Sequence, residues 1–257
     1  MKLQRFPPTI ALQPYLREFI LIETDEATES MVIPDTSLVM SLRYKGAVIK
    51  KRLDEEELLP DVVISGLRRS VRHFIYTPQA ANFLIVFKEG GIAAISRTPA
   101  NELFDQSISA GNFFRQGELD QLLEGLAEAA TDSLRVRQVE DFLLRRLINT
   151  KQDALIGNAV QLIRQHKGIV RIDQLAASLH LSQDPFEKRF RSLVGSTPKQ
   201  YASIVRLRQL IRNYPAYSSL TEASYAAGYF DQSHFIKDFR LFTGRAPGEF
   251  FQSSRFW

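Results

Sequence analysis

The sequence predicts an α+β protein of two domains, and three observations support that prediction. Short strand-like runs occupy residues 1–110, amphipathic helical patterns follow from about residue 117, and the C-terminal part repeats a helical unit. A chain of 257 residues is long enough for one large or two modest domains. We therefore expect a β-rich domain with C-terminal helices over residues 1–150 and an all-α domain over residues 151–257.

Five apolar runs, each bounded by Pro, Gly or Asp, indicate strands in the first half of the chain: 38–44, 47–49, 62–65, 71–76 and 82–87. Closely spaced short strands favour a barrel or a sandwich. The acidic run 54–57 is typical of a solvated loop, and residues 89–91 are typical of a turn between strands. Leucines at helical spacing over 119–126 and a second apolar stripe from Val136 to Ile148 predict two helices. Such a stripe is more typical of an intramolecular core than of a dimer seam, which stays the alternative.

Composition excludes several classes of protein. With 44% hydrophobic and 24% charged residues the chain is globular, and the absence of cysteine removes disulfides, thiolate metal sites and cysteine nucleophiles. We expect no signal peptide and no membrane span, hence a cytoplasmic location. A cupin enzyme needs several histidines around a metal, yet residues 1–150 contain only His73, which we expect to be structural. Nucleophile-elbow, Walker and dinucleotide motifs are also missing, so we expect no enzyme, metal or cofactor.

Charge divides unevenly between the two halves. Residues 151–257 carry 15 Lys and Arg against 8 Asp and Glu, a balance of +7, whereas residues 1–150 carry 18 against 21, a balance of −3. A compact basic domain beside a mildly acidic one points to a polyanionic partner, and nucleic acid is favoured over a membrane because no basic amphipathic anchor is evident.

An internal repeat strengthens this interpretation. Eight positions recur 49 residues later, seven of them identical and one aromatic for aromatic: Gln183, Phe186, Lys188, Phe190, Arg191, Gly195, Pro198 and Tyr201 return as Gln232, Phe235, Lys237, Phe239, Arg240, Gly244, Pro247 and Phe250. Each copy is predicted to form a short helix, a tight turn, a second helix and a glycine stop, which is the layout of a helix-turn-helix.

Capping residues place the helices of the two copies. Ser182 and Asp231 are the expected N-caps of the second helix of each copy, and Thr221 the expected cap of the first helix of copy two. Thr197 and Pro198 begin a joining helix of some sixteen residues, about 24 Å long. Because adjacent major-groove faces of B-DNA lie roughly 34 Å apart, two units on such a rod could occupy successive grooves, with some bending of the duplex.

The side chains opposite the buried phenylalanines are the candidate base-reading residues. They are Gln183, Asp184, Glu187, Lys188 and Arg191 in the first copy, and Gln232, Ser233, His234, Ile236, Lys237 and Arg240 in the second. Asp184 and Glu187 repel phosphate, so we expect the second unit to bind DNA more strongly. The candidate phosphate contacts are Lys199, Arg206, Arg212 and Arg245.

This pattern resembles a known family over about residues 155–252. The spacing of Ser182, Phe186, Lys188, Phe190, Gly195, Pro198, Tyr201 and Arg206, followed by Gly228 to Phe235, Phe239, Gly244 and Pro247, is similar to the DNA-binding domain of AraC/XylS-type transcription regulators. Leu179 stands where the second copy has Gly228. The resemblance implies promoter binding through two major-groove helices. It also implies a cupin-like N-terminal domain that senses a small molecule or pairs two subunits, and contact with RNA polymerase is a further possible partnership.

Two alternatives remain at this stage. The N-terminal half could bind no effector and serve only for dimerisation or contact with another protein. Alternatively, it could be a cupin-type enzyme that the repeat tethers to DNA.

Overall fold

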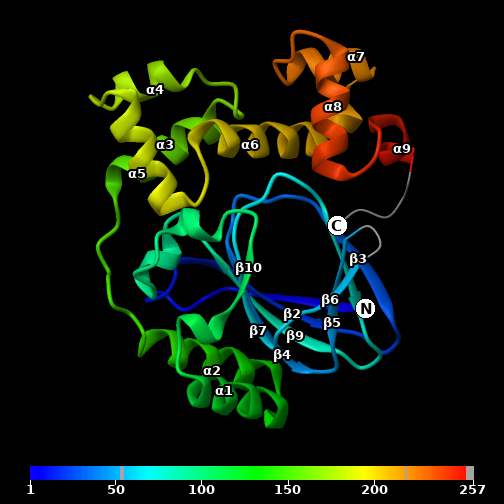
Figure 1. Cartoon of the computed structure of the whole chain (residues 1–257), viewed down its shortest axis with the longest axis vertical. Coiled ribbons are helices and arrows are strands. Elements are labelled where there is room, and N and C mark those ends of the chain that lie inside the picture. Colours follow the sequence, from blue (N-terminus) through cyan, green and yellow to red (C-terminus); the bar gives the residue numbers. More distant parts are fainter. Residues whose placement is uncertain (53–54, 218, 253–257) are drawn as a thin grey trace.

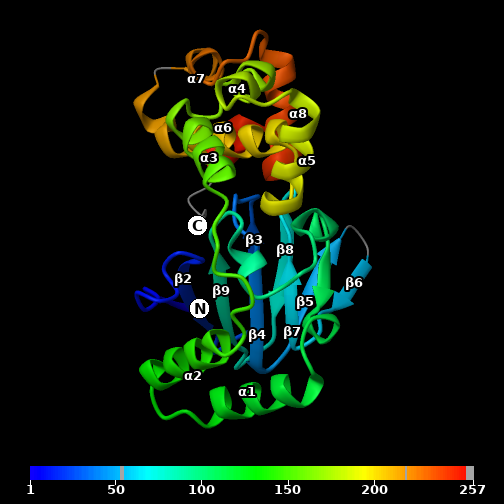
Figure 2. The ribbon, with the colours of Figure 1, turned by 90° about the vertical axis from the view of Figure 1, so that its left-hand side faces the viewer.

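A computed structural model describes residues 1–52, 55–217 and 219–252, and Figures 1 and 2 show a β-rich domain with an all-helical domain above it. The predicted α+β class and the order of its two parts are confirmed. The boundary near residue 150 stays a prediction, although residues 149–153 form an irregular connection between helices on either side.

Two antiparallel sheets form the β-rich domain. One has the order β1-β2-β9-β4-β7-β10, with strands Lys2–Phe6, Leu16–Glu23, Ala81–Phe87, Val39–Lys45, Val62–Ser65 and Ser107–Ser109. The other has the order β3-β8-β5-β6, with strands Thr28–Val32, Arg72–Tyr76, Val48–Arg52 and Glu55–Leu58. The sheets pack through a small apolar cluster that includes Ile22 and Val63 from the first sheet and Val48 and Tyr76 from the second. This arrangement is the sandwich form of the predicted β-rich fold.

The larger core lies on the other face of the six-stranded sheet. Phe19, Phe83 and Ile85 are buried there beneath helices α1 (Gln116–Glu128) and α2 (Asp132–Leu144) and three short 3₁₀ helices, η1 (Gly91–Ala94), η2 (Ala100–Leu103) and η3 (Ala110–Asn112). Strand β9 is covered on both faces, so it reads as a nearly continuous apolar run rather than an alternation.

The apolar stripe on α2 packs within the core of the same chain, which supports the favoured interpretation over a dimer seam. Val139, Phe142 and Leu143 are buried within the same core, and the ring of Phe142 meets that of Phe114 edge to face with centroids 5.4 Å apart. Ile148, at the far end of the stripe, remains 53% exposed. Most of this apolar surface is therefore used inside one chain.

Three interpretations of the first half need correction. Residues 55–57 are not a loop but part of strand β6, which pairs with β5 and matches Lys50 with Glu57 at 2.9 Å; residue 54 lies outside the described residues. Because every side chain of this edge strand is exposed, it carries no apolar signal. Residues 89–91 do turn the chain, but they lead from β9 into η1 rather than into another strand. His73 is exposed on β8, so it is not a core histidine.

Seven α-helices make up the described part of the C-terminal domain. They are α3 (Ala154–Gln165), α4 (Ile172–Ser178), α5 (Gln183–Val194), α6 (Pro198–Asn213), α7 (Leu220–Ala226), α8 (Gln232–Thr243) and α9 (Pro247–Gln252), with a 3₁₀ turn at Tyr214–Ala216. Helix α3, which the repeat does not include, packs against α6. Among residues 1–52, 55–217 and 219–252, no helix has the length and apolar character needed to cross a bilayer.

The repeat places equivalent aromatic residues in equivalent cores. Phe186, Phe190 and Tyr201 are fully buried in the first unit and make edge-to-face contacts with centroids 5.7 Å apart. In the second unit, Phe239 meets Phe235 at 5.5 Å and Phe250 at 5.2 Å. Burial of three rings in each unit fixes which face of α5 and α8 turns inward.

The observed helix N-caps agree only in part with those predicted from the sequence. Asp231 accepts a hydrogen bond from the His234 amide at 2.7 Å, and Thr197 and Gln200 form a reciprocal capping box at the start of α6. Ser182 occupies the N-cap position of α5, but its side chain makes no capping bond. The cap of α7 is Ser219, which accepts from the Glu222 amide at 3.1 Å, and not Thr221, because α7 begins two residues earlier than predicted.

Gly244 ends α8 in the left-handed region, with φ of 77°, and its amide donates to the Arg240 carbonyl. A Cβ at this position would lie 3.0 Å from Val71 Cγ1. We expect Gly244→Val to destabilise the protein by about 1 to 3 kcal/mol, because a β-branched residue resists positive φ. Thermal unfolding measures the loss. The matched variant is Gly248→Val, whose Cβ finds open space in α9, and equal melting temperatures for the two would contradict the capping role.

Candidate nucleic-acid interface

Helix α6 holds the two helix-turn-helix units in a fixed relation. The first unit is α4 and α5, the second is α7 and α8, and Figure 2 shows α5 and α8 on the same side of α6. Tyr201, Ile204 and Val205 of α6 are buried in the core that both units share. The predicted joining rod is therefore present, and it carries one polar helix face at each end.

The outward face of α5 contains four exposed side chains: Gln183, Asp184, Lys188 and Arg191. Glu187 is only half-exposed, and its carboxylate accepts a hydrogen bond from Gln183 Nε2 at 2.8 Å. Gln183 and Glu187 are thus joined by a hydrogen bond along the helix. Lys188 and Arg191 are the exposed cationic side chains of this outward face.

The outward face of α8 contains five exposed side chains: Gln232, Ser233, His234, Lys237 and Arg240. Ile236, predicted to belong to this face, is half-buried and packs against the core, because it lies on the flank of the helix between Phe235 and Phe239. Ser233 and Ile236 replace the acidic Asp184 and Glu187 of the first unit, so the α8 face carries no carboxylate at these two positions.

The four candidate phosphate contacts separate into two kinds. Lys199, Arg212 and Arg245 are exposed on the surface of the C-terminal domain. Arg206 differs from these three, because its half-buried guanidinium lies over the Tyr229 ring at 4.2 Å and 3.8 Å from the Asp238 carboxylate. Sequence position alone could not separate these cases, since all four follow from basic character rather than from helix face.

The turn of the first unit differs from that of the second by one residue. Gly228 takes the left-handed conformation after α7, with φ of 73°, whereas after α4 that conformation belongs to His180, with φ of 57°. Histidine is among the residues that tolerate this region. Leu179, which aligns with Gly228, keeps a negative φ, so the missing glycine does not prevent the turn.

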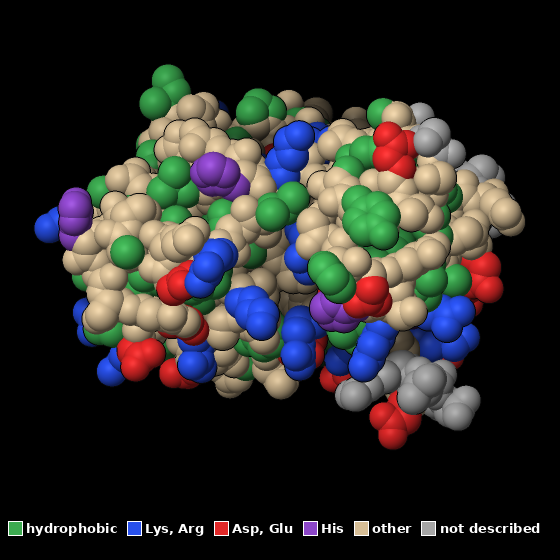
Figure 3. Space-filling model, turned by 90° about the horizontal axis from the view of Figure 1, so that it is seen from above, with side chains coloured by type: hydrophobic (Ala, Val, Ile, Leu, Met, Phe, Trp, Pro, Cys, Tyr) green, Lys and Arg blue, Asp and Glu red, His purple; other side chains and the backbone are tan. Residues whose placement is uncertain are grey.

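Figure 3 looks down on the C-terminal domain and shows Lys and Arg side chains gathered in the middle of this face, where the surface is hollowed between two lobes, and along one edge. Asp and Glu side chains lie mostly toward the periphery of the same view. This face therefore presents basic side chains close together, as a polyanion-binding surface requires.

Comparisons with known proteins agree with this geometry. Residues 175–253 match a family described as a helix-turn-helix domain, and residues 4–109 match one described as a domain of unknown function, DUF6597. The chain is 26% identical over 119 residues to the HTH-type transcriptional regulator MtrA of Neisseria gonorrhoeae, a match of 45% of this chain and 39% of MtrA. It is 27% identical over 147 residues to the Msm operon regulatory protein of Streptococcus mutans, a match of 55% of this chain and 48% of that protein. The chain therefore spans less than half of each relative's length.

Solved structures with similarity to this chain include ToxT from Vibrio cholerae, at 10% identity and a TM-score of 0.48, with 99% of this chain and 100% of ToxT covered. The AraC-like transcriptional activator CuxR is similar at 12% identity and a TM-score of 0.28, over 88% of this chain and 90% of CuxR.

The fold and the interface define a β-rich domain joined to a double helix-turn-helix domain. Residues 175–253 match a helix-turn-helix domain, which agrees with the resemblance to the DNA-binding domain of AraC/XylS-type regulators found in the sequence.

Proposed function

We propose that this protein is a sequence-specific DNA-binding transcription regulator and not an enzyme. The observation that carries the proposal is the pair of polar faces on α5 and α8, which lie on the same side of α6 and are each backed by buried phenylalanines. The names of the curated relatives, which are regulators, support the same assignment.

The reading chemistry follows from the exposed side chains. Gln183 and Gln232 suit adenine, and Lys188 and Lys237 suit guanine O6 and N7 in the major groove. Arg191 and Arg240 lie one turn further along each helix. Lys199, Arg212 and Arg245 supply phosphate contacts, which set affinity without reading sequence.

Selection of bound sequences from a random duplex pool tests this proposal on the full chain. We expect an enriched motif, and with about six phosphates neutralised the logarithm of the association constant should fall against the logarithm of salt concentration with a slope near −5. A titration of the selected duplex between about 50 and 200 mM salt measures the slope. A pool without enrichment, or a flat salt response, contradicts DNA reading.

Effector control is favoured by a cavity at the domain junction. It has a volume of about 320 Å³ and is bordered by Tyr15, the turn Lys88 to Gly91, the connection Asn149 to Asp153, and Val160 of α3. A molecule bound there would touch both domains and the chain between them. A thermal-shift screen of the full chain against metabolites tests effector control, since a ligand that binds the folded state raises the melting temperature. If no compound stabilises the protein, the alternative is favoured, in which the N-terminal domain serves dimerisation or contact with another protein.

A further inference from the structure

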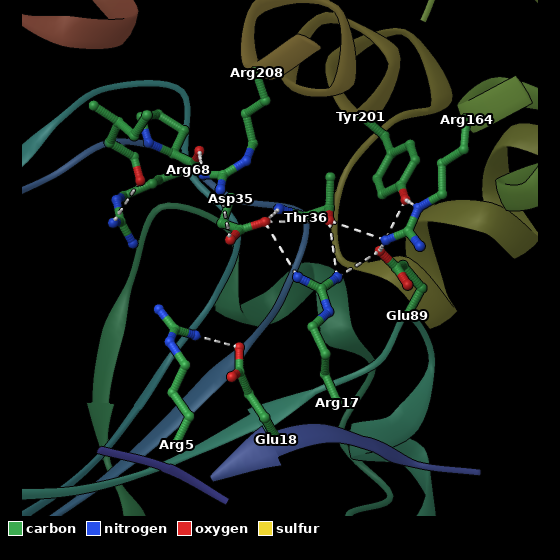
Figure 4. A network of polar contacts seen from close by, with 12 residues as sticks. Arg5, Arg17, Glu18, Asp35, Thr36, Arg68, Glu89, Arg164, Tyr201 and Arg208 are labelled. Carbon is green, nitrogen blue, oxygen red and sulfur yellow. Dashed lines mark hydrogen bonds and ion pairs between the residues drawn. The ribbon is translucent and has the colours of Figure 1, made fainter. Parts of the chain in front are cut away.

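Glu89 is the centre of a polar cluster between the two domains (Figure 4). Its side chain is only 8% exposed, although it lies in the turn after β9. One carboxylate oxygen, Oε1, accepts from Arg164 Nη2 at 2.5 Å and from the Tyr201 hydroxyl at 2.8 Å, and Arg17 Nη2 lies 3.5 Å away. Arg164 Nε also donates to the Tyr201 hydroxyl at 3.0 Å. One carboxylate of the N-terminal domain, that of Glu89, thus accepts hydrogen bonds from both α3 and α6 of the C-terminal domain.

A second carboxylate extends the same cluster. Asp35 lies 3.4 Å from Arg208 of α6 and 3.6 Å from Arg17 of β2. Burial opposes ionisation of Asp35, but Arg208, Arg17 and hydrogen bonds from Thr36 outweigh it and lower the pKa of the carboxyl. Arg208 Nη1 also donates to the Pro34 carbonyl at 3.1 Å. We call the contacts of Glu89 and Asp35 with Arg164, Tyr201 and Arg208 the interdomain clasp.

The interdomain clasp determines which part of the N-terminal domain lies beside α5, the reading helix of the first unit. Helix α5 packs against η2 of the N-terminal domain, and a Cβ built on Gly195, at the end of α5, would lie 3.5 Å from Ala100 Cβ. Further along, Pro99 and Asn101 form one wall of an open groove of about 660 Å³. The opposite wall is the outward face of α5, from Asp184 through Lys188 and Arg191 to Ser192.

Such a groove conflicts with the geometry of major-groove reading. A recognition helix enters a groove about 12 Å wide and 8.5 Å deep, so a sugar-phosphate strand must pass on each side of it. On one side of α5, that path is bounded by Pro99 and Asn101. A Cβ on Gly244, the equivalent of Gly195, would also lie close to the N-terminal domain, 3.0 Å from Val71 Cγ1. Among the described residues, however, α8 has no contact with that domain as extensive as the contact of α5 with η2. Ser233, Lys237 and Arg240 of α8 remain exposed.

We propose that the interdomain clasp holds the N-terminal domain against the reading face of the first helix-turn-helix unit, so that α5 enters DNA only after the clasp opens. This inference rests on the proposed function. The second unit reads DNA in the arrangement described here, and opening of the clasp adds the first. The free energy needed to open the clasp reduces the net free energy of binding to a site that spans both units. It does not change the free energy of binding to a half-site that α8 alone reads.

Glu89→Gln tests the clasp, and Glu18→Gln is its matched control. Glu18 pairs with Arg5 at 2.6 Å within the N-terminal domain, so its substitution removes the same charge from the same domain without touching the clasp. We expect Glu89→Gln to tighten binding of the full selected site about fivefold or more, the lower end of usual coupling between sites, and to leave binding of the second half-site unchanged. Glu18→Gln should change neither. Equal affinities of the two variants for the full site, or weaker binding by Glu89→Gln, would overturn the proposal.

A disulfide provides the opposite perturbation. The chain contains no cysteine, so Ala100→Cys combined with Gly195→Cys can form one bond only, and the 3.5 Å between the two Cβ positions suits a disulfide. The oxidised protein should bind the full site no more tightly than the half-site, and reduction should restore the difference. The reduced form controls for any strain at Gly195. Full-site affinity that does not respond to oxidation contradicts the proposal.

Failure of this inference and failure of the proposed function give different results. If the parent protein selects no sequence from the random pool, DNA reading itself is wrong. If the parent selects a site but neither Glu89→Gln nor the disulfide alters its binding, only the clasp is wrong.

Discussion

Gly168→Ala should destabilise the protein by about 3 kcal/mol or more, although it adds a single methyl group. Gly168 follows α3 with φ of +78°, and its amide donates to the Ile163 carbonyl at 2.8 Å. A Cβ there would lie 2.2 Å from the Ala202 carbonyl oxygen and 2.7 Å from the Arg206 amide nitrogen of α6. Backbone atoms of a packed helix cannot move aside as a flexible side chain can. Urea or thermal unfolding measures the change.

Gly157→Ala is the matched control, because it adds the same methyl group inside α3, the helix that Gly168 follows. A Cβ at residue 157 meets nothing within 4 Å, and alanine replaces glycine inside α3. We expect this variant to be more stable than the parent by roughly 0.5 to 1 kcal/mol. If both variants unfold at the same denaturant concentration, the close approach of Gly168 to α6 is not what makes glycine necessary.

Lys237→Ala should weaken binding of the selected site about tenfold or more, while binding of random-sequence DNA falls much less. Lys237 is exposed near the middle of the α8 reading face. A side chain that contacts a base edge contributes about 1 to 3 kcal/mol of discrimination, whereas loss of one charge weakens contacts with all sequences alike. Gln232→Ala should behave in the same way. Competition binding against selected and random duplexes measures the ratio.

Arg212→Ala is the control for lost charge. Arg212 is exposed in the last turn of α6, away from the reading faces, so its loss should weaken both kinds of DNA equally and reduce the salt slope by about one. Should Lys237→Ala, Gln232→Ala and Arg212→Ala lower specific and random binding in the same proportion, the outward face of α8 does not read bases.

The helical half of this fold could be predicted well because the repeat supplies its own check. Phe186, Phe190, Phe235 and Phe239 recur at one offset, and their burial fixes the inward face of each reading helix. Caps with a side-chain oxygen next to a clear amphipathic stripe were also predictable, as at Asp231. The cap of α7 was missed because serine and threonine are close together there and either fits a cap.

The β-rich half was less accessible to such reasoning. Strands β1, β2, β3, β6 and β10 were not predicted, because edge strands such as β6 lack apolar residues and central ones such as β2 depend on distant partners. The outward faces of α5 and α8 followed from spacing, but the role of Arg206 did not, since its partner Tyr229 is 23 residues away. The interdomain clasp is equally invisible in the sequence, because Glu89 meets Tyr201 only through the tertiary fold.

Base-methylation interference on the selected site tests the central claim most directly. Two helix-turn-helix units on one side of α6 predict two blocks of interfering bases in the major groove, about one helical turn apart on one face of the duplex. Lys237→Ala should weaken the interference in one block, and Lys188→Ala should weaken it in the other. A single block, or interference spread without regard to the groove, would contradict the account of α5 and α8 as paired reading helices.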